Sequence, residues 1–197
     1  HAQGMFRERF VMGEAQLTPI TEPDITLGEI ACAEPLSIGL HAIHRAGPVM
    51  GETVLVTGGG TIGSMSGIAA RLAGAAHVIV CYINDRALEM ARTVGADRMI
   101  RSDRVKPEAL ADLAEVSIEA AGSPAALATC LQATRRGGRI VQVGTLPPEV
   151  SFPANSVMAR ELDYRGAFRA HQAFDCNASL LITPPNSGCG AGNCFPL

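Results

Sequence analysis

One stretch of the chain limits its possible folds more than any other. Residues 54–82 read "VLVTGGGTIGSMSGIAARLAGAAHVIVCY", which is an apolar run, a glycine-rich turn, a segment of small residues and a second apolar run. This order predicts a strand, a turn, a helix and a second strand. Because both strands are apolar on both sides, we expect them to be parallel and covered by helices on each face of a sheet.

The same alternation continues toward the C-terminus, with a period of roughly 20–30 residues. Further helices are expected over 85–96 and 123–138, the second with Ser123 as its N-cap. Further strands are expected over 97–100, 116–122, 139–144 and 161–168. A helix over 27–47 precedes the glycine-rich turn, and residues 1–30 are expected to form one or two strands and a loop. The sequence therefore predicts an α/β fold with a doubly wound parallel sheet.

The charge balance argues against a nucleic-acid partner. The 197 residues include 16 Lys and Arg against 19 Asp and Glu, a net charge of −3, with no basic stripe that would neutralise a phosphate backbone. No apolar run reaches the roughly 20 residues that span a bilayer, and the sequence shows no pattern of a secretion leader. We therefore expect a cytoplasmic protein with neither nucleic acid nor a membrane as partner.

The six cysteines are spread along the chain, which favours reduced thiols over a disulfide framework. Cys32, Cys81 and Cys130 are expected to be small core residues. Cys189 and Cys194 frame "CGAGNC", which lacks the spacing and nearby histidines of a structural zinc site. We therefore expect no metal at this pair.

The glycines of the turn have two alternative roles. Gly58, Gly60 and Gly63 follow the spacing G-x-G-x-x-G. In a dinucleotide-binding turn the first glycine permits the tight turn, the second lets the backbone approach a pyrophosphate, and the third lets helix and strand pack closely. Amides around Ile62 and Gly63 would then point at the phosphates, at the positive end of the helix dipole. The alternative is a turn that serves packing alone, but the position between a strand and a helix favours dinucleotide binding.

The residue that would select between NAD and NADP is unusual. An acidic residue at the end of the second strand would accept hydrogen bonds from the adenosine ribose of NAD. Tyr82 stands at this position, with Asp85 and Arg86 shortly after it. Arg86 could pair with the 2'-phosphate of NADP, whereas Asp85 is interpreted as a cap of the following helix. The sequence leaves the choice of NAD or NADP open.

Several segments together resemble a known family. They agree with it in both order and spacing, and read "ACAEPLSIGLHAIHRAG", "ETVLVTGGGTIG", "ALEMARTVGAD", "IEAAGSPAALATCLQATRRGGRIVQVG" and "ELDYRGAFR". The chain is similar, over roughly residues 1–175, to the zinc-type medium-chain dehydrogenase/reductase family. Within it, the segments look most like the polyol and aldonate branch, where the L-idonate 5-dehydrogenases stand beside the sorbitol dehydrogenases.

The resemblance implies how the chain is divided. Residues 1–45 would be the C-terminal remnant of a GroES-like substrate domain with its linking helix, and residues 46–170 a Rossmann domain that binds NAD(P). Residues 171–197 are left unassigned. In such enzymes zinc acts as a Lewis acid on a secondary alcohol, which releases hydride to the nicotinamide. The expected substrate is a small polyol or aldonate, and the intact enzyme is expected to be a homodimer or homotetramer.

The resemblance also suggests roles for single residues. Glu34 in "AEPLS" matches the catalytic-site glutamate that ligates zinc or contacts zinc-bound water. Ser37 falls near the expected nicotinamide ring, and Gly144, Phe168 and Arg169 lie on segments that line the nicotinamide end of the cofactor. For Glu34 the alternative is an exposed acid that the helix dipole favours at a helix start.

Other polar residues have plain structural interpretations. His41 and His44 lie three apart on one predicted helix and could hold a metal, but a solvated helix face is the favoured reading. Arg135 and Arg136 are expected at the C-terminal end of a helix, where its dipole is negative.

The family's remaining zinc ligands have no match in this chain. Its first zinc-binding cysteine, its Gly-His-Glu segment and its four-cysteine zinc lobe would precede residue 1, so the zinc site is expected to be incomplete. Residues 176–197 do not match the family's further strands and helices. Two alternatives to an active zinc enzyme therefore stay open. One is a truncated, non-catalytic module that binds NAD(P), and the other, less favoured, is a zinc-free reductase of the same superfamily.

Overall fold

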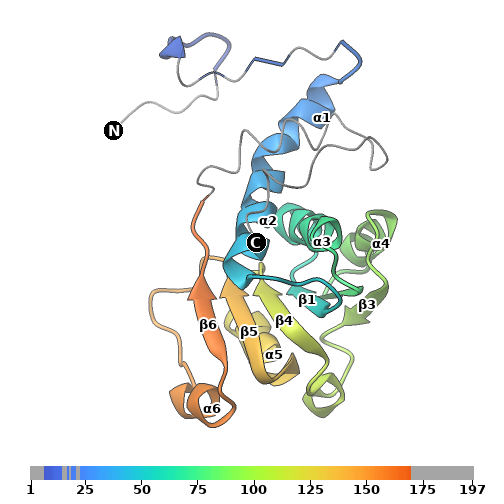
Figure 1. The fold of residues 1–197 in the computed structure, drawn as a ribbon, viewed down its shortest axis with the longest axis vertical. Helices are drawn as coiled ribbons and strands as arrows, with labels where there is room; N and C mark the ends of the chain where they lie inside the picture. The colour runs from blue at the N-terminus through green and yellow to red at the C-terminus, as the bar shows by residue number, and fades with distance from the viewer. Residues whose placement is uncertain (1–6, 15–16, 18, 21–22, 170–197) are drawn as a thin grey trace.

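The computed structural model describes residues 7–14, 17, 19–20 and 23–169. Its centre is one sheet of six parallel strands in the order β3-β2-β1-β4-β5-β6 (Figure 1). The strands are β1 (Thr53–Thr57), β2 (His77–Tyr82), β3 (Arg98–Arg101), β4 (Ala114–Glu119), β5 (Thr134–Gln142) and β6 (Asp163–Gly166). This order is that of a Rossmann fold, so the predicted doubly wound α/β sheet is confirmed.

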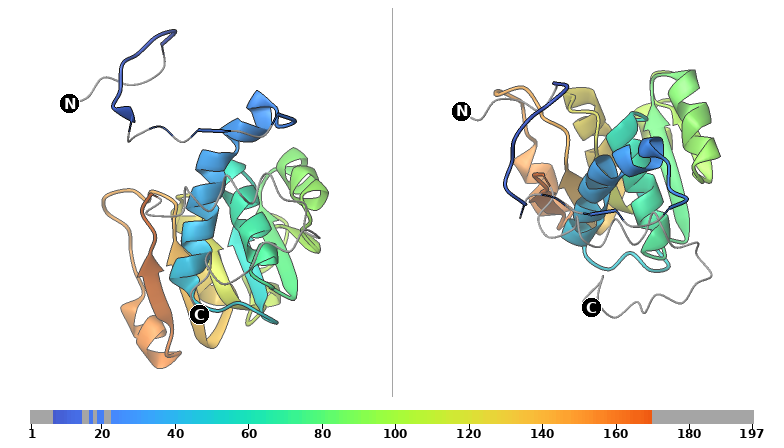
Figure 2. Two further views of the ribbon diagram at one scale, coloured as in Figure 1. Left: turned by 45° about the horizontal axis from the view of Figure 1, so that its top comes forward. Right: turned by 90° about the horizontal axis from the view of Figure 1, so that it is seen from above.

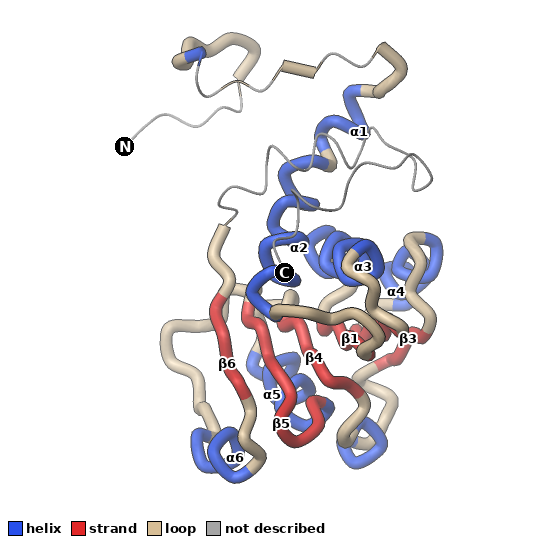
Figure 3. Tube along the Cα trace, in the orientation of Figure 1, coloured by secondary structure: helices blue, strands red, loops and turns tan. Residues whose placement is uncertain are grey.

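Helices connect the strands and cover both faces of the sheet (Figure 3). They are α1 (Leu27–Ala31), α2 (Ala33–Ala46), α3 (Thr61–Leu72), α4 (Asp85–Thr93), the 3-10 helix η2 (Pro107–Leu110), α5 (Pro124–Ala133) and α6 (Ala154–Ala159). Neither η2 nor α6 was predicted from the sequence, since each is short and carries only one or two turns.

The alternation of side chains along β1 divides the core into two layers. Val54 and Val56 are fully buried in one cluster with residues of α2, α3 and α4. Leu55, between them, is buried in a second cluster with residues of η2 and the end of α5. The turned views in Figure 2 show α2 and α3 together over the first face. A strand buried on both sides cannot alternate between polar and apolar residues, which is why β1 reads as a continuous apolar run.

The helix expected over 27–47 is interrupted at Cys32. Thr26 caps α1, accepting from the amide of Glu29, and Gly47 ends α2 with a φ of +83°. Pro35 has no amide hydrogen to donate to the carbonyl of Ala31, so the helical ladder cannot run through this point unbroken. The prediction of one or two strands within residues 1–30 is wrong for the described part of this range, because residues 7–14, 17, 19–20 and 23–26 contain no strand.

The helix expected over 123–138 ends earlier than predicted. After Ala133 the chain enters β5, and the pairing of β5 with β4 shifts register between Ala114 and Val116. At this irregularity a Cβ on Gly138 would lie 2.7 Å from the carbonyl oxygen of Glu115, so only glycine fits without displacement.

The role expected for Arg135 and Arg136 is therefore wrong. Both lie in β5, where Arg135 pairs with Glu115 at 2.7 Å and Arg136 donates to the carbonyl oxygen of Ala159. A different cation, Arg160, donates to carbonyl oxygens at the end of α5.

Close approach of α2 and α3 fixes the helix layer. A Cβ on Gly39 would lie 2.6 Å from the backbone carbonyl of Met65 in α3 and 2.8 Å from the amide nitrogen of Ser66. The backbones of α2 and α3 are thus closer to each other than the backbones of two helices with larger side chains between them. Figure 1 shows α2 beside α3, with α1 and the start of α2 extending beyond the sheet.

Asp97 ties the end of α3 to the start of β2. Its carboxylate accepts from the Val78 amide at 2.7 Å and pairs with Arg71. The Val78 amide, together with the Arg71 guanidinium, holds the pKa of Asp97 below its ordinary value. A lowered carboxylate pKa contributes stability that is present above the ordinary pKa and is lost as the pH falls through the lowered one.

We expect Asp97→Asn to reduce the free energy of unfolding by about 0.5 kcal/mol at pH 7, because both side chains are partly exposed. The difference from the wild type should shrink as the pH falls through the lowered pKa of Asp97, because the carboxyl group itself then becomes neutral. Urea unfolding of both proteins between pH 7 and 2.5 measures this. A difference that stays constant over the range would contradict the assignment.

Candidate functional site

The carboxyl ends of the strands gather the glycine-rich turns at one edge of the sheet. Gly58 follows β1 with a φ of +107°, a left-handed conformation that favours glycine. A Cβ on Gly58 would also lie 2.9 Å from backbone atoms of Ala120 and Ala121, just after β4. Because β1 and β4 are neighbours and their connections leave on opposite sides, this is the switch point where ligands bind in α/β sheets.

The third glycine is the most tightly enclosed. A Cβ on Gly63 would lie 1.8 Å from the carbonyl oxygen of Gly58. This contact brings the first turn of α3 directly against the end of β1, which is the packing role expected for the third glycine of the motif.

The second glycine leaves open space. A Cβ on Gly60 would have no neighbour within 4 Å. Gly60 is the N-cap of α3 and its backbone is extended, and among the described residues no side chain caps the amides of the first turn at Thr61, Ile62 and Gly63. Free helix N-terminal amides beside an open approach form the kind of cradle that holds a phosphate.

Tyr82 packs against this turn. A Cβ on Gly59 would lie 3.0 Å from Cδ1 of the Tyr82 ring, and the half-buried ring also joins the core cluster under α3 and α4. The ring thus occupies the end of β2, where an acid was expected.

Asp85 does not cap α4. The N-cap is Asn84, whose Oδ1 accepts from the amide of Ala87 at 3.0 Å, so the expected cap was placed one residue too late. Asp85 instead pairs with Arg101 at 2.6 Å, and the Arg101 hydrogen bond holds the pKa of Asp85 below its ordinary value. Arg101 is thus paired with Asp85. Arg86 is exposed in the first turn of α4, and it remains the candidate cation for a 2'-phosphate.

A buried carboxyl group lies at the same edge and was missed by the sequence analysis. Glu119, the last residue of β4, is fully buried. Its Oε1 accepts from the amides of Ala121 at 3.0 Å and Gly122 at 2.8 Å. The signal was an acid directly after the apolar Ile118, at the end of β4, whose sequence is AEVSIE.

Gly144, expected near the nicotinamide, lies against this group. A Cβ on Gly144 would be 2.3 Å from the amide nitrogen of Gly122 and 2.6 Å from Oε2 of Glu119. The turn after β4, residues 120–122, therefore contacts Gly58 in the turn after β1 and Gly144 in the turn after β5.

The other residues suggested by the resemblance have local partners or are exposed. Glu34 is exposed in the first turn of α2. Ser37 is buried and its hydroxyl donates to the carbonyl oxygen of Glu34 at 2.6 Å. Phe168 follows β6 and is 80% exposed, with the Arg169 guanidinium 5.1 Å from its ring centre. No contact between these four side chains and the glycine turn appears among the interactions of the described residues.

The described residues do not form a metal site. Among them no group of three or more His, Cys, Asp and Glu side chains is arranged to hold a metal. His44 is exposed and His41 partly exposed on α2. Burial raises the pKa of Cys81 to about 11 and that of Cys130 to about 12, so both are protonated thiols in the core, as expected. Cys189 and Cys194 lie outside the described residues.

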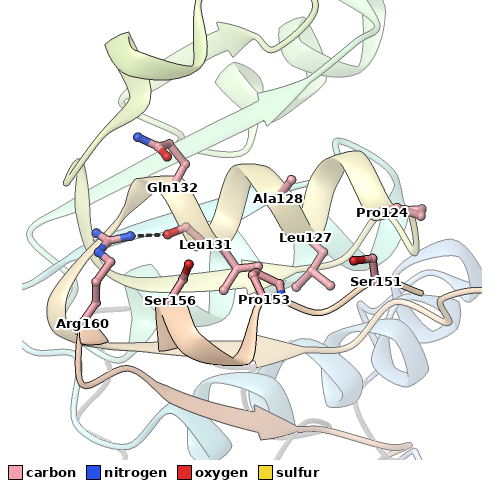
Figure 4. A pocket seen from close by; sticks show the side chains of 9 residues that line it. All are labelled: Pro124, Leu127, Ala128, Leu131, Gln132, Ser151, Pro153, Ser156 and Arg160. Carbon is pink, nitrogen blue, oxygen red and sulfur yellow. Dashed lines mark hydrogen bonds between the residues drawn. The ribbon is translucent and has the colours of Figure 1, made fainter. Parts of the chain in front are cut away.

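A pocket of about 300 Å³ lies elsewhere, between α5 and α6 on the second face of the sheet (Figure 4). It is lined by Pro124, Leu127, Ala128, Leu131, Gln132, Ser151, Pro153, Ser156 and Arg160. The Arg160 guanidinium already donates to the carbonyl oxygens of Leu131 and Thr134 and pairs with Asp112 at 2.6 Å. This cation is therefore engaged within the protein, and we assign the pocket no ligand.

The sequence model of the zinc-binding dehydrogenases matches residues 61–182. The chain belongs to this family. The match starts at the first residue of α3 and covers more than half of the 197 residues, so it confirms the resemblance predicted from the segments around the glycine turn.

Relatives within the family include polyol and aldonate dehydrogenases. Sorbitol dehydrogenase of Gallus gallus is 37% identical over 82% of this chain and 48% of its own length. L-Idonate 5-dehydrogenase (NAD(P)(+)) of Escherichia coli is 34% identical over 77% of this chain and 45% of its own. The chain thus spans about half the length of these relatives.

Solved structures of the family share the fold. The crystal structure of Escherichia coli L-idonate 5-dehydrogenase superposes with a TM-score of 0.78 and 31% identity, covering 82% of this chain and 47% of that one. A Sinorhizobium meliloti protein described as a zinc-binding dehydrogenase, solved bound to NADP, gives a TM-score of 0.72 and 30% identity. This superposition covers 81% of this chain and 52% of the Sinorhizobium meliloti chain.

The helices give no sign of a membrane segment. In the described part of the chain, none is both long and apolar enough to cross a bilayer.

Proposed function

We propose that this chain binds NAD or NADP at the switch point between β1 and β4. One observation carries the proposal: the open approach at Gly60 to the uncapped amides at the start of α3. In this arrangement Gly58 forms the turn, Gly60 admits the pyrophosphate, the amides of Ile62 and Gly63 donate to it, and the α3 dipole adds favourable charge. The NADP-bound relative from Sinorhizobium meliloti supports the choice of ligand class.

We further propose that the bound cofactor serves hydride transfer with a secondary alcohol of a polyol or aldonate. The bound nicotinamide supplies the hydride acceptor. Gly144, Phe168 and Arg169, which follow β5 and β6 at the carboxyl edge, would line its nicotinamide end, with Ser37 of α2 nearby. The named relatives, a sorbitol and an L-idonate dehydrogenase, support the substrate class.

The zinc expected for the family does not fit the described residues, and we derive no step through it. Glu34 is the single residue that the resemblance places at the metal, and it is exposed on α2 without a cluster of other ligands among the described side chains. Its role as a zinc ligand, or as a contact of zinc-bound water, is a proposal that rests on the resemblance.

Titration of the purified chain with NADH and with NADPH, followed by cofactor fluorescence, tests the binding proposal. Circular dichroism and cooperative thermal unfolding must first show that the sample is folded. We expect saturable binding of at least one cofactor. A folded sample that binds neither would overturn the proposal and leave the glycine turn a packing element.

A second function is favoured by the lack of a metal-ligand cluster in the described residues: a module that binds NAD(P) without catalysis. Incubation with NAD or NADP, zinc and either sorbitol or L-idonate distinguishes the two functions. Formation of NADH or NADPH would exclude the non-catalytic module. Binding without turnover of either substrate would support it.

We expect Arg86→Ala to weaken NADPH binding about tenfold and to leave NADH binding unchanged, because one charged hydrogen bond to the 2'-phosphate is lost. The measurement is the dissociation constant of each cofactor, obtained by fluorescence titration of the variant and the wild type.

Arg92→Ala is the matched control. Arg92 lies at the other end of α4, where it is exposed and 4.0 Å from Glu89, so the variant loses the same charge away from the proposed phosphate position. Equal losses of NADPH and NADH affinity in Arg86→Ala, or an NADPH-specific loss in Arg92→Ala, would remove Arg86 from the site.

A further inference from the structure

Glu119 stands out because an acid in the centre of the sheet needs a physical reason. The residue is fully buried, and the neighbouring strand positions Val116 and Ile118 are fully buried apolar residues. A buried carboxyl group is costly unless it is hydrogen-bonded or neutral. Burial raises the pKa of Glu119 above its ordinary value, and hydrogen bonds from the following amides offset only part of this rise.

The side chain holds a turn in place. Oε1 accepts from both the Ala121 and the Gly122 amide, so one oxygen fixes two successive peptide groups after β4. Gly122 has a φ of +66°, a left-handed conformation. A turn with this backbone leaves the two amides pointing inward, where no strand partner could satisfy them.

The second carboxylate oxygen of Glu119 has no hydrogen-bond partner in the described part of the chain. Oε2 is buried without a hydrogen bond to any described residue, and it faces Gly144 at the position where a Cβ would stand. The Glu119 backbone also accepts from the amides of Val143 at 2.8 Å and Gly144 at 2.9 Å. Side chain and backbone of this one residue thus hold the turns after β4 and after β5.

The pyrophosphate loop rests on the same turn. A Cβ on Gly58 would come within 2.9 Å of backbone atoms of Ala120 and Ala121. The amide of Ala120 in turn donates to the carbonyl oxygen of Thr57 at 2.9 Å. A displacement of residues 120–122 would therefore displace Gly58, and with it the start of α3.

We propose that Glu119 is a positioning residue of the cofactor site, which holds the 120–122 turn and through it the pyrophosphate loop and Gly144. The inference rests on the proposed binding of NAD(P). The group acts as a hydrogen-bond acceptor, and its negative charge is not required.

Two variants of Glu119 separate the effect of the hydrogen-bond acceptor on cofactor binding from the effect of the negative charge. Glu119→Gln keeps an oxygen at the same distance and is neutral, so it should bind NADH within about threefold of the wild type. Glu119→Leu keeps a similar volume but leaves two amides unpaired, so we expect NADH and NADPH affinities to fall at least about tenfold. Each dissociation constant is measured by fluorescence titration alongside a thermal unfolding curve.

The control lies at the other end of the same strand. Glu115 also accepts from a backbone amide, that of Thr53 at 2.8 Å, and pairs with Arg135. Glu115→Leu should therefore lower the unfolding temperature while leaving cofactor affinity unchanged. Equal loss of affinity in Glu115→Leu and Glu119→Leu would mean that stability alone governs binding, and would overturn the proposal.

The remaining outcomes are also decisive. A folded Glu119→Leu that binds like the wild type overturns the inference, whereas a wild type that binds neither cofactor removes the proposed function itself. If Glu119→Leu does not fold, Glu119→Asp takes its place, because the shorter side chain cannot reach both amides. Weaker binding by Glu119→Asp than by Glu119→Gln supports the inference, and equal binding contradicts it.

Discussion

Gly60→Asp is expected to abolish binding of NADH and NADPH without unfolding the protein. The new carboxylate would stand at the uncapped start of α3, where the pyrophosphate is proposed to lie, and two negative groups cannot share that place. Gly60 has an ordinary φ of −76° and its Cβ would meet nothing within 4 Å, so the fold has room for the side chain. We expect a loss of affinity of at least about a hundredfold, since like charges at close range in a partly desolvated site cost several kcal/mol.

The control for this variant is Gly60→Ala, which adds the Cβ without the charge. It should keep the unfolding temperature of the wild type and lose much less affinity than Gly60→Asp. Both dissociation constants come from fluorescence titration, and both unfolding temperatures from circular dichroism. Retention of wild-type affinity by Gly60→Asp would show that the turn holds no phosphate.

Gly63→Ala is expected to have the opposite profile, with a large loss of stability. Its Cβ would stand 1.8 Å from the carbonyl oxygen of Gly58, a distance at which backbone must move. Insertion of one methyl group into a well-packed site costs typically about 1–3 kcal/mol, and here the obstacle is backbone, so we expect at least about 3 kcal/mol. Urea unfolding of the variant and the wild type measures the difference.

Gly67→Ala is the matched control for Gly63→Ala, in the same helix one turn further on. Its Cβ would lie 3.5 Å from Cγ1 of Val78, an ordinary contact. Because alanine favours helices over glycine by up to about 1 kcal/mol, this variant should be as stable as the wild type or slightly more stable. Equal destabilisation by the two variants would contradict the close packing of α3 on β1.

Sequence patterns predicted best where a segment is buried on both sides and bounded by glycine. β1 and β2 were expected from their apolar runs, and β2 ends at Tyr82, the last residue of the stretch 54–82 from which it was predicted. The two glycine roles that depend on backbone geometry, at Gly58 and Gly63, were also expected from the motif, and their close contacts agree with it. These features depend on neighbours in the chain, which the sequence displays directly.

The features that were wrong or missed depend on contacts between distant segments. The helix expected through residue 138 ends at Ala133, because Thr134 and the residues from Arg139 onward pair with β4 instead of continuing the helical turn. Asp85 was interpreted as a cap, but its partner, Arg101, lies on β3 and could not be identified from the local sequence. Glu119 was missed for the same reason, since its meaning comes from the turns that fold back over it.

The close passage of α2 over α3 has a mechanical consequence. With a glycine at 39 against the backbone of Met65 and Ser66, α2 cannot slide or roll on α3 without the two main chains colliding. We expect the helix that starts beside Glu34 and the helix that starts at Gly60 to move as one rigid body. The separation between the proposed metal-side glutamate and the proposed phosphate cradle would then stay constant whenever the rest of the enzyme opens or closes around its ligands.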